Sequence, residues 1–209
     1  RASTSLLAGV PMHWMVRWPG AYPVYAEEAW GARFRDVDGI EYVDFCLGDT
    51  DAMTGHSPEP VVRAVAAQAA RGITLMLPSE EALWVGEELG RRFGLPRWQF
   101  ALTATDANRF AIRLARHVTE RPKVLVFNWC YHGTVDESFA TLRDGRVVER
   151  DGSLGPPVPL DETTRVVEWN DTEALRRELA HGDVACVLAE PALTNIGIVH
   201  AQPGFHEAL

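Results

Sequence analysis

The chain has 209 residues, of which 46% are hydrophobic; this is enough for a large buried core and too much for a disordered protein. The 29 acidic and 20 basic residues give a formal net charge of −9, which argues against nucleic acid or an anionic membrane as a partner. The sequence contains no apolar run of membrane-spanning length and opens with no signal peptide.

Cysteine and lysine usage narrows the class of protein further. The cysteines are far apart and lack CxxC spacing, so the sequence predicts neither a disulfide framework nor a metal site. A reducing cytoplasm is therefore the expected location. Lys123 is the single lysine, and the chain begins at Arg1 rather than at methionine, which suggests a fragment.

Residues 1–56 are predicted to form a small amino-terminal α/β segment with a β-hairpin. The stretch ARFRDVDGIEYVDF alternates between apolar and polar residues. Asp38 and Gly39 in its middle are a strong signal for a hairpin turn, so strands are expected on both sides of them.

Two helices are predicted next. HSPEPVVRAVAAQAARG begins with Ser57 as a candidate cap and ends at Gly72. SEEALWVGEELGRRFG has Ser79 as its candidate cap and Gly94 as its candidate end.

The chain then alternates between strand and helix patterns. Strands are expected over WQFALT, KVLVF, TRVVEW and VACVLAE, and helices over DANRFAIRLARHV, around residues 135–139, and over DTEALRRELAHG. Strands this apolar are typical of a sheet that is buried on both faces. Residues 57–209 are therefore predicted to be the first part of a large α/β domain, a three-layer sandwich with a mostly parallel sheet.

The segment between Thr141 and Thr163 is rich in glycine, proline and charge. It is long for a plain connection. The sequence leaves two interpretations open, a functional lid and a mobile surface excursion.

Polar groups stand where three of these strands end, which is where parallel sheets bind ligands. In LTATDANRF, Thr103, Ala104 and Thr105 lie at a strand-to-helix turn that suits an anion, although a simple helix cap by Thr105 or Asp106 explains the same residues.

The other two clusters follow the strands KVLVF and VACVLAE. Tyr131 and Gly133 suit a flat ligand approached closely by backbone, and the alternative is a core tyrosine beside a satisfied histidine. Glu190 ends an apolar strand and Asn195 follows it; the alternative there is a carboxylate tied to a neighbouring helix end.

In their order and spacing, these segments resemble the first half of a class III, fold-type I pyridoxal phosphate (PLP) aminotransferase. DVDGIEYVDF followed by GHSP resembles the family's amino-terminal hairpin and first long helix. FALTATDANRFAIRLAR resembles its phosphate-binding turn, YHG its ring-stacking motif, EWND its recurrent Asn-Asp segment and EPALTNIG its E-P-x-x-x-N-x-G stretch. The branch that it resembles most contains glutamate-1-semialdehyde aminomutase and related aminotransferases.

The resemblance implies a PLP site and assigns roles to residues of this chain. Thr103, Ala104 and Thr105 would cradle the phosphate, Tyr131 would stack on the pyridine ring, and Glu190 and Asn195 would line the edge of the ring and the substrate cavity. The cofactor-binding residues that it implies are Thr103, Ala104, Thr105, Tyr131, His132, Gly133, Glu190 and Asn195.

The sequence also departs from the family pattern. Ala104 stands where the family has glycine, and Asp106 replaces a glutamate. Arg17 is the candidate for holding a substrate carboxylate. Asp49 and Asp51 lie near the expected substrate mouth, where acidic groups would disfavour a dicarboxylate.

The resemblance implies a transaminase that moves an amino group from an amino acid or amine to a keto acid or aldehyde. An intramolecular 2,1-aminomutase is the first alternative, and a truncated, non-catalytic binding or assembly protein is the second. The lysine that forms the Schiff base is expected beyond Leu209. Lys123 begins the KVLVF strand, at the end opposite the ligand, and is expected to be a solvated surface residue.

The family's active sites lie at a homodimer interface, so a homodimer is expected. Candidates for that interface are large apolar groups that need a covering surface. They are Trp14, Trp18, Trp30 and the ITLMLPS stretch.

Overall fold

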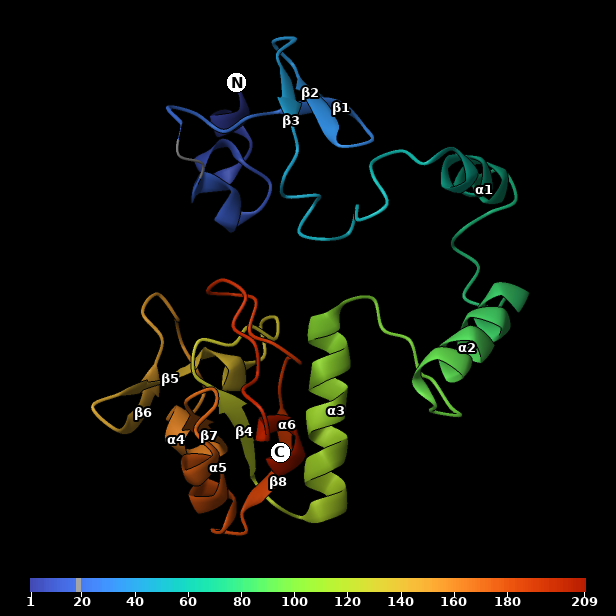
Figure 1. The fold of residues 1–209 in the computed structure, drawn as a ribbon. Helices are drawn as coiled ribbons and strands as arrows, with labels where there is room; N and C mark the ends of the chain where they lie inside the picture. The colour runs from blue at the N-terminus through green and yellow to red at the C-terminus, as the bar shows by residue number, and fades with distance from the viewer. Residues whose placement is uncertain (18–19) are drawn as a thin grey trace. The chain divides into compact units, whose positions relative to one another are not determined.

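The structure is a computed structural model that describes residues 1–17 and 20–209, so Trp18 lies outside the described residues. Contacts between residues divide the chain into two compact units, Arg1–Trp84 (unit 1) and Val85–Leu209 (unit 2) (Figure 1). The domain boundary expected between residues 56 and 57 stays a prediction.

Unit 1 contains the predicted hairpin. The strands pair antiparallel in the order β1-β2-β3, and short 3-10 turns precede them. The Asp36 carboxylate fixes the turn between β2 and β3, because its Oδ1 accepts hydrogen bonds from the N–H groups of Asp38 (3.0 Å) and Ile40 (2.8 Å). The bounds are η1 Ala2–Thr4, η2 Leu7–Gly9, η3 His13–Arg17, β1 Ala26–Trp30, β2 Arg33–Asp36 and β3 Glu41–Val43.

The two predicted helices are α1 (Glu59–Ala69) and α2 (Glu80–Phe93). The expectation that Ser57 caps α1 is wrong. Pro58 is the N-cap residue, and the Ser57 hydroxyl donates instead to the Ala29 carbonyl at 2.9 Å. Ser57 has a φ of 53°, outside the extended region that a cap residue normally adopts. Its side chain accordingly faces β1, which contains Ala29.

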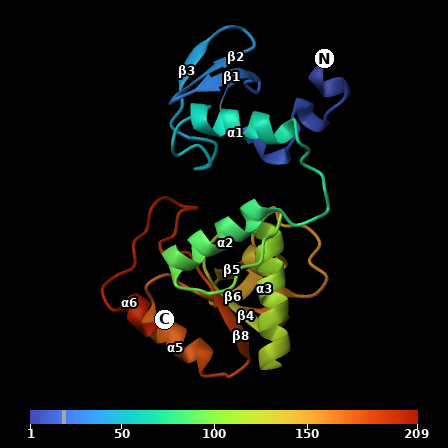
Figure 2. The same ribbon diagram turned by 90° about the vertical axis from the view of Figure 1, so that its right-hand side faces the viewer.

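Unit 2 is built on a parallel three-stranded sheet in the order β7-β4-β8. Helix α3 contacts β8 and helix α5 contacts β7, on opposite sides of the sheet in Figure 1. Figure 2 shows α3 beside the sheet from a second direction. The bounds are α3 Ala104–Thr119, β4 Lys123–Phe127, η4 Asp136–Phe139, β5 Ala140–Arg143, β6 Arg146–Glu149, α4 Leu160–Thr163, β7 Thr164–Val167, α5 Thr172–Leu179, β8 Val184–Leu188 and α6 Phe205–Ala208.

The central strand β4 lies in the core of unit 2. Val124, Leu125, Val126 and Phe127 are all fully buried, as a strand covered on both faces requires. The α/β class is therefore confirmed, and the complete three-layer sandwich stays a prediction.

One expectation about unit 2 is wrong. WQFALT forms no strand: residues 98–103 run as irregular chain into α3, because a strand needs a hydrogen-bonded neighbour and the described sheet pairs only β4, β7 and β8.

The segment 141–163, for which a lid and a surface excursion both stay predictions, has secondary structure of its own. It contains most of the hairpin β5–β6, whose turn residues Asp144 and Gly145 both have positive φ (52° and 72°), followed by α4.

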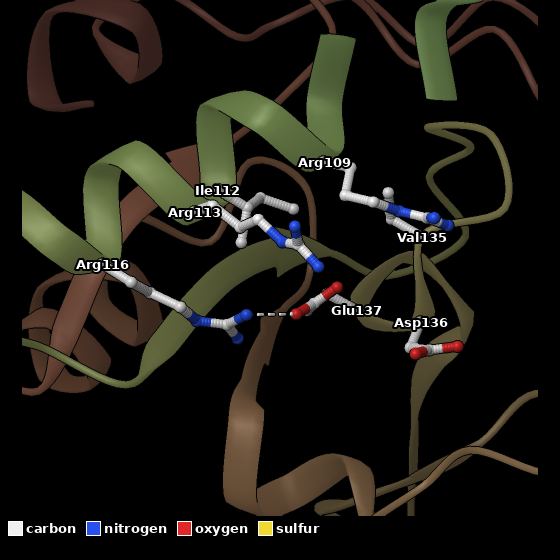
Figure 3. A pocket seen from close by; sticks show the side chains of 7 residues that line it. All are labelled: Arg109, Ile112, Arg113, Arg116, Val135, Asp136 and Glu137. Atoms are coloured by element: carbon white, nitrogen blue, oxygen red, sulfur yellow. Dashed lines mark ion pairs between the residues drawn. The ribbon is translucent and has the colours of Figure 1, made fainter. Parts of the chain in front are cut away.

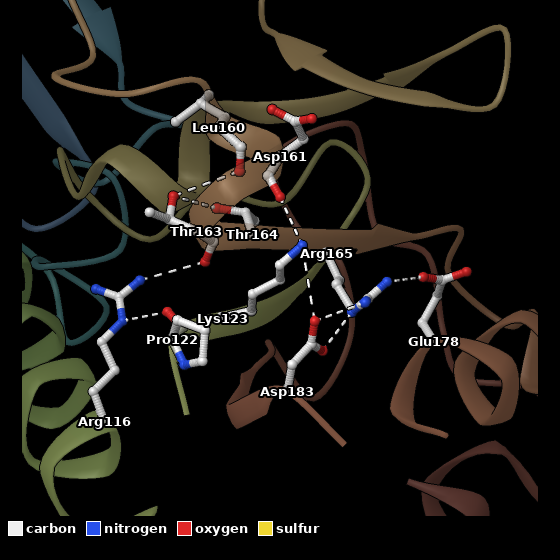
Figure 4. Close-up of polar contacts among 10 residues, drawn as sticks. All are labelled: Arg116, Pro122, Lys123, Leu160, Asp161, Thr163, Thr164, Arg165, Glu178 and Asp183. Carbon is white, nitrogen blue, oxygen red and sulfur yellow. Dashed lines mark hydrogen bonds and ion pairs between the residues drawn. The ribbon is translucent and has the colours of Figure 1, made fainter. Parts of the chain in front are cut away.

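The amino-terminal ends of the strands carry a polar network (Figure 4). Arg165 makes two 2.7 Å hydrogen bonds to Asp183 and one of 2.7 Å to Glu178. Lys123 is not a freely solvated surface residue as expected. Only 22% of its side chain is exposed, and its Nζ donates to the Asp161 carbonyl at 2.8 Å. Helix α4 contacts β4, and the Lys123 N–H donates to the Asp183 carbonyl at 3.1 Å, so neighbouring chain covers most of this residue.

None of the helices in residues 1–17 and 20–209 combines the length and the apolar character needed to cross a membrane.

Candidate functional site

Three loops meet at the carboxyl ends of the parallel strands. The β4 loop is residues 128–133, the β7 loop is residues 168–171 and the β8 loop is residues 189–195. Hydrogen bonds join the β4 loop to each of the other two, and its last residue packs against the first turn of α3. The predicted site segments of unit 2 therefore come together at one edge of the sheet, where parallel folds bind ligands.

The first turn of α3 offers free main-chain donors. Thr103 is the N-cap: its Oγ1 accepts from the Asp106 N–H at 3.1 Å and donates to the Asp106 carboxylate at 2.9 Å. The cap is thus Thr103 rather than Thr105 or Asp106. Since its hydroxyl is engaged within the helix, an anion at this turn would be met by the N–H groups that begin the helix, including that of Ala104.

Gly133 and Thr105 make the tightest approach in the site. Gly133 has a φ of +76°, and a Cβ built on it would lie 2.1 Å from Thr105 Oγ1 and 3.0 Å from Thr105 Cβ. The Thr105 Oγ1 also accepts a hydrogen bond from the Thr134 N–H at 3.1 Å. Only glycine therefore fits at this position, and the hydroxyl hydrogen of Thr105 is left to donate to a ligand.

Tyr131 exposes its side chain at the same edge. The residue is 55% exposed, so its ring is available to a flat ligand. Its main-chain N–H lies 3.5 Å from Glu190 Oε1, at the limit of a hydrogen bond. This placement agrees with the expectation of an aromatic ring exposed at the carboxyl ends of the strands, and it does not agree with the alternative of a core tyrosine.

His132 is buried, at 8% exposure, and its carbonyl accepts from Asn108 Nδ2 at 3.0 Å. Burial lowers the pKa of its imidazole below the ordinary value of 6.5; the Glu190 carboxylate opposes this and the Arg150 guanidinium adds to it. The imidazole is therefore neutral at pH 7. Its buried Nε2 has no hydrogen-bond partner among the described residues.

Glu190 and Asn195 hold the β8 loop in place. Glu190 Oε2 accepts from the N–H and the hydroxyl of Thr194, at 2.9 and 2.6 Å. Asn195 Nδ2 donates to the Trp129 carbonyl at 3.1 Å, which ties this loop to the β4 loop. The Glu190 carboxylate is thus hydrogen-bonded within its own loop and faces the Tyr131 N–H of the β4 loop, and it is not tied to a helix end.

Several polar residues at this edge were not predicted from the sequence. Asn128 is buried and accepts from Thr141 Oγ1 at 2.6 Å and donates to Glu168 at 2.6 Å, so it joins the hairpin β5–β6 to the β7 loop. Its position directly after a buried strand was a usable signal, since Glu190 was found by the same reasoning. Arg150 had no such signal, because the hairpin that carries it was expected to be a loop.

Arg17 and Asp49, the predicted substrate residues, belong to unit 1. Arg17 ends η3 and is exposed. Asp49 is exposed and has a φ of 61° in the loop after β3. A 2.6 Å hydrogen bond between His56 Nε2 and the Asp44 carboxylate closes this loop at its base.

A cavity of about 330 Å³ lies between α3 and η4, apart from the strand-end residues (Figure 3). The 2.8 Å ion pair between Arg116 and Glu137 lies in it and joins the two elements. The cavity is lined by Arg109, Ile112, Arg113, Arg116, Val135, Asp136 and Glu137. None of the predicted site residues lines it.

The strand-end site fits a ligand that has both a planar ring and an anionic group. The exposed ring of Tyr131 provides a flat surface, and the first turn of α3 provides N–H donors. The close contact between Gly133 and Thr105 holds these two features together, and His132 Nε2 remains as a buried, unpartnered polar atom. The residues present therefore suit PLP.

The sequence matches the aminotransferase class III family over residues 15–209. Among curated proteins, the glutamate-1-semialdehyde 2,1-aminomutase of Methanosphaera stadtmanae is 34% identical over 191 residues, which are 90% of this chain and 45% of that protein. The chain thus spans about half the length of the curated relatives that it matches.

The chain is similar to solved structures over almost its whole length. A glutamate-1-semialdehyde aminomutase from Pseudomonas aeruginosa PAO1 is 54% identical with a TM-score of 0.96, covering 99% of this chain and 46% of that chain. A variant of that enzyme has been solved in complex with PMP. An omega-transaminase from Sphaerobacter thermophilus is 30% identical with a TM-score of 0.86, covering 99% of this chain and 49% of that chain.

Proposed function

Because the chain belongs to the class III aminotransferase family, we propose that the complete protein moves an amino group from an amino acid or amine donor to a keto acid or aldehyde acceptor. The family consists of PLP-dependent enzymes, and relatives named as enzymes give no support to a non-catalytic role. The observation that carries the proposal is the joining of the α3 amino terminus to the Tyr131 segment through Gly133 and Thr105.

The chain's own residues bind and orient the cofactor in this proposal. The N–H groups at the start of α3, together with the Thr105 hydroxyl, hold the phosphate, while Tyr131 stacks on the ring. His132 and Gly133 support that ring-bearing loop, and Glu190 and Asn195 fix the loop beside it. Bound PLP supplies a reversible carrier for the amino group and an electron sink for proton removal at the adjacent carbon.

Other parts of the proposal concern the complete protein. The lysine that bonds covalently to PLP lies beyond Leu209, and Arg17 and Asp49 contact substrate. The described sheet is part of a three-layer sandwich that starts at about residue 57. The protein is a cytoplasmic homodimer, with Trp14, Trp18, Trp30 and residues 73–79 as candidates for the interface.

An intramolecular 2,1-aminomutase is the second candidate, favoured by the names of the relatives. The identities are 54% to the solved aminomutase and 34% to the curated one, against 30% to the omega-transaminase, so similarity favours the aminomutase names, and the family itself contains both reactions. The two reactions differ in one respect that can be measured: an aminomutase keeps the amino group on one carbon skeleton and needs no acceptor.

Given an amino donor alone, the full-length enzyme is expected to stop after one turnover per site, with the cofactor left in its amine form. Adding a keto acid or an aldehyde should restart donor consumption. Absorbance of the bound cofactor and product analysis would follow both phases. Continued turnover of a single substrate, such as glutamate-1-semialdehyde, without any acceptor would contradict transamination and support the aminomutase.

Thr105→Val in the full-length protein is expected to weaken PLP binding by about 10- to 100-fold, since a hydrogen bond to a charged group is worth about 1.5–3 kcal/mol. Equilibrium dialysis or fluorescence quenching would give the dissociation constant. Thr119→Val, at the other end of α3, is the matched control, because its hydroxyl donates to the Ala115 carbonyl. Equal affinities for the two variants would remove Thr105 from the proposed phosphate site.

Tyr131→Ala is expected to weaken PLP binding by about 10-fold through loss of stacking, and Tyr131→Phe by much less. Stacking uses the face of the ring, and the hydroxyl takes no part in it. The same binding measurement applies to both variants. If phenylalanine is as damaging as alanine, the hydroxyl carries the role and the stacking account is wrong.

A further inference from the structure

Side chains from other segments hold the main chain of the β4 loop. Each donates to a carbonyl of residues 129–133, so the path of the chain on both sides of Tyr131 is set from outside the loop. The donors are Asn195 to the Trp129 carbonyl (3.1 Å), Arg150 to the Cys130 carbonyl (2.9 Å), Asn108 to the His132 carbonyl (3.0 Å) and Ser138 to the Gly133 carbonyl (2.9 Å).

Arg150 is the charged member of this set, and it comes from the hairpin β5–β6. It directly follows β6, and its own N–H donates to the Phe139 carbonyl at 2.8 Å, which closes the base of the hairpin. Its guanidinium reaches the fully buried Cys130, the residue before Tyr131. The Arg150 Nε is itself buried and has no partner among the described residues.

The Arg150 side chain is therefore partly buried, and its guanidinium lies close to the groups on both sides of Tyr131. Burial raises the pKa of the Cys130 thiol to about 11, with Arg150 lowering it and Glu190 raising it. The same two charges act on His132, where Arg150 disfavours the imidazolium. The charged groups that act on His132 thus come from the end of β6 and from the β8 loop.

We propose that Arg150 is a positioning residue that fixes the main chain beneath Tyr131 and so orients the ring that meets the cofactor. This inference rests on the proposed stacking role of Tyr131. It also gives the hairpin β5–β6 a part in the site: the hairpin supports the cofactor loop through Arg150, a partly buried arginine whose Nε is fully enclosed. The hydrogen bond to the Cys130 carbonyl is charge-assisted, which is among the stronger kinds in proteins.

The test uses the full-length protein without cofactor and compares Arg150→Met, Arg150→Lys and Arg146→Met. Arg146 begins β6 and is exposed, which makes it the matched control on the same hairpin. Amide hydrogen exchange over residues 129–133 is expected to be about 10- to 100-fold faster in Arg150→Met, because this variant loses a hydrogen bond made by a charged group. β4 should keep its protection, and Arg146→Met should behave as the unchanged protein.

A second readout separates positioning from general stability. Histidine-selective NMR, with His132 assigned from the variant His132→Gln, should show a raised pKa for His132 in Arg150→Met, because a positive charge beside it has been removed. Arg150→Lys keeps the positive charge, so the pKa of His132 should stay near that of the unchanged protein. The amides of residues 129–133 should exchange a few-fold faster in this variant, because lysine lacks the planar guanidinium that fixes the direction of the hydrogen bond.

The outcomes distinguish this inference from the proposed function. Unchanged exchange over residues 129–133 in Arg150→Met would overturn it, and so would an equal loss of protection throughout β4. If Arg150→Met does not fold, unchanged exchange in Arg150→Lys overturns it in the same way. Faster exchange in the Arg150 variants combined with normal PLP affinity of Tyr131→Ala would leave the positioning role intact and refute the stacking role.

Discussion

Gly133→Ala is expected to lower the free energy of unfolding of unit 2 by about 2–4 kcal/mol and to abolish tight cofactor binding. The new Cβ would lie 2.1 Å from Thr105 Oγ1 and 3.1 Å from the Thr105 main chain, so the first turn of α3 or the β4 loop must move. The φ of +76° adds a smaller penalty, about 1 kcal/mol, for any residue with a Cβ. Native-state hydrogen exchange of the β4 amides, together with the PLP dissociation constant, measures both effects.

Gly145→Ala is the matched control for this variant. Gly145 has a φ of +72°, almost the same as that of Gly133, but no atom of the described residues lies within 4 Å of its Cβ position beyond its chain neighbours. It should show only the backbone penalty and leave PLP binding unchanged. Combining Gly133→Ala with Thr105→Ala should recover part of the lost stability, because the nearest clashing atom is removed. Equal costs for Gly133→Ala and Gly145→Ala would mean that the close packing is not what requires glycine.

Arg165→Met is expected to lower the free energy of unfolding by about 2 kcal/mol, a value between those for exposed and for fully buried ion pairs. The Arg165 side chain is 15% exposed and binds Asp183 through two hydrogen bonds and Glu178 through a third (Figure 4). Its removal leaves Asp183 with only the longer 3.8 Å contact to Lys123, and Glu178 with only its 3.2 Å contact to the exposed Arg177. Arg176→Met is the control, because Arg176 makes a 2.7 Å ion pair with Glu173 in which both side chains are mostly exposed. That variant should leave stability unchanged.

The Arg165 network also predicts a pH dependence. Hydrogen bonds from Arg165 are the largest cause that holds the pKa of Asp183 below its ordinary value of 3.8. Because the folded pKa is the lower one, this contribution to stability is fully present above the unfolded pKa and is lost as pH falls through the folded value. Unfolding curves between about pH 2 and 6 should therefore converge for the unchanged protein and Arg165→Met at the acid end. A constant difference across this range would contradict the assignment.

Elements with strong local signals were predicted correctly from the sequence. The KVLVF run became β4 because four consecutive apolar residues suit a strand covered on both faces. The Asp38-Gly39 turn formed because both residues favour a tight turn, and helix α3 formed behind the cap Thr103. The Asp144-Gly145 turn carried the same kind of signal, yet the proline and glycine around it favoured the interpretation as a loop.

The candidate site was predicted in part for the same reason. Tyr131, Glu190 and Asn195 follow the parallel strands β4 and β8, whose ends meet at one edge, whereas Thr103 follows irregular chain rather than the expected strand. The partners that hold these residues were not predicted. Asn108, Asn128 and Arg150 act on main-chain carbonyls or on buried side chains, and a sequence does not show which carbonyls lack a partner.

What the sequence by itself determined is local: the apolar runs, the Asp38-Gly39 turn, helix α3 and the family motifs, all set by residues within one turn or one strand of each other. The tertiary structure alone decided that WQFALT has no strand to pair with, that Lys123 is held by the Asp161 carbonyl, and how Arg150 reaches the loop of Tyr131. Arg150 and Cys130 are 20 residues apart, and Thr105 and Thr134 are 29 apart. Contacts at such separations depend on the path of the whole chain, because packing at close-packed density decides which distant atoms meet.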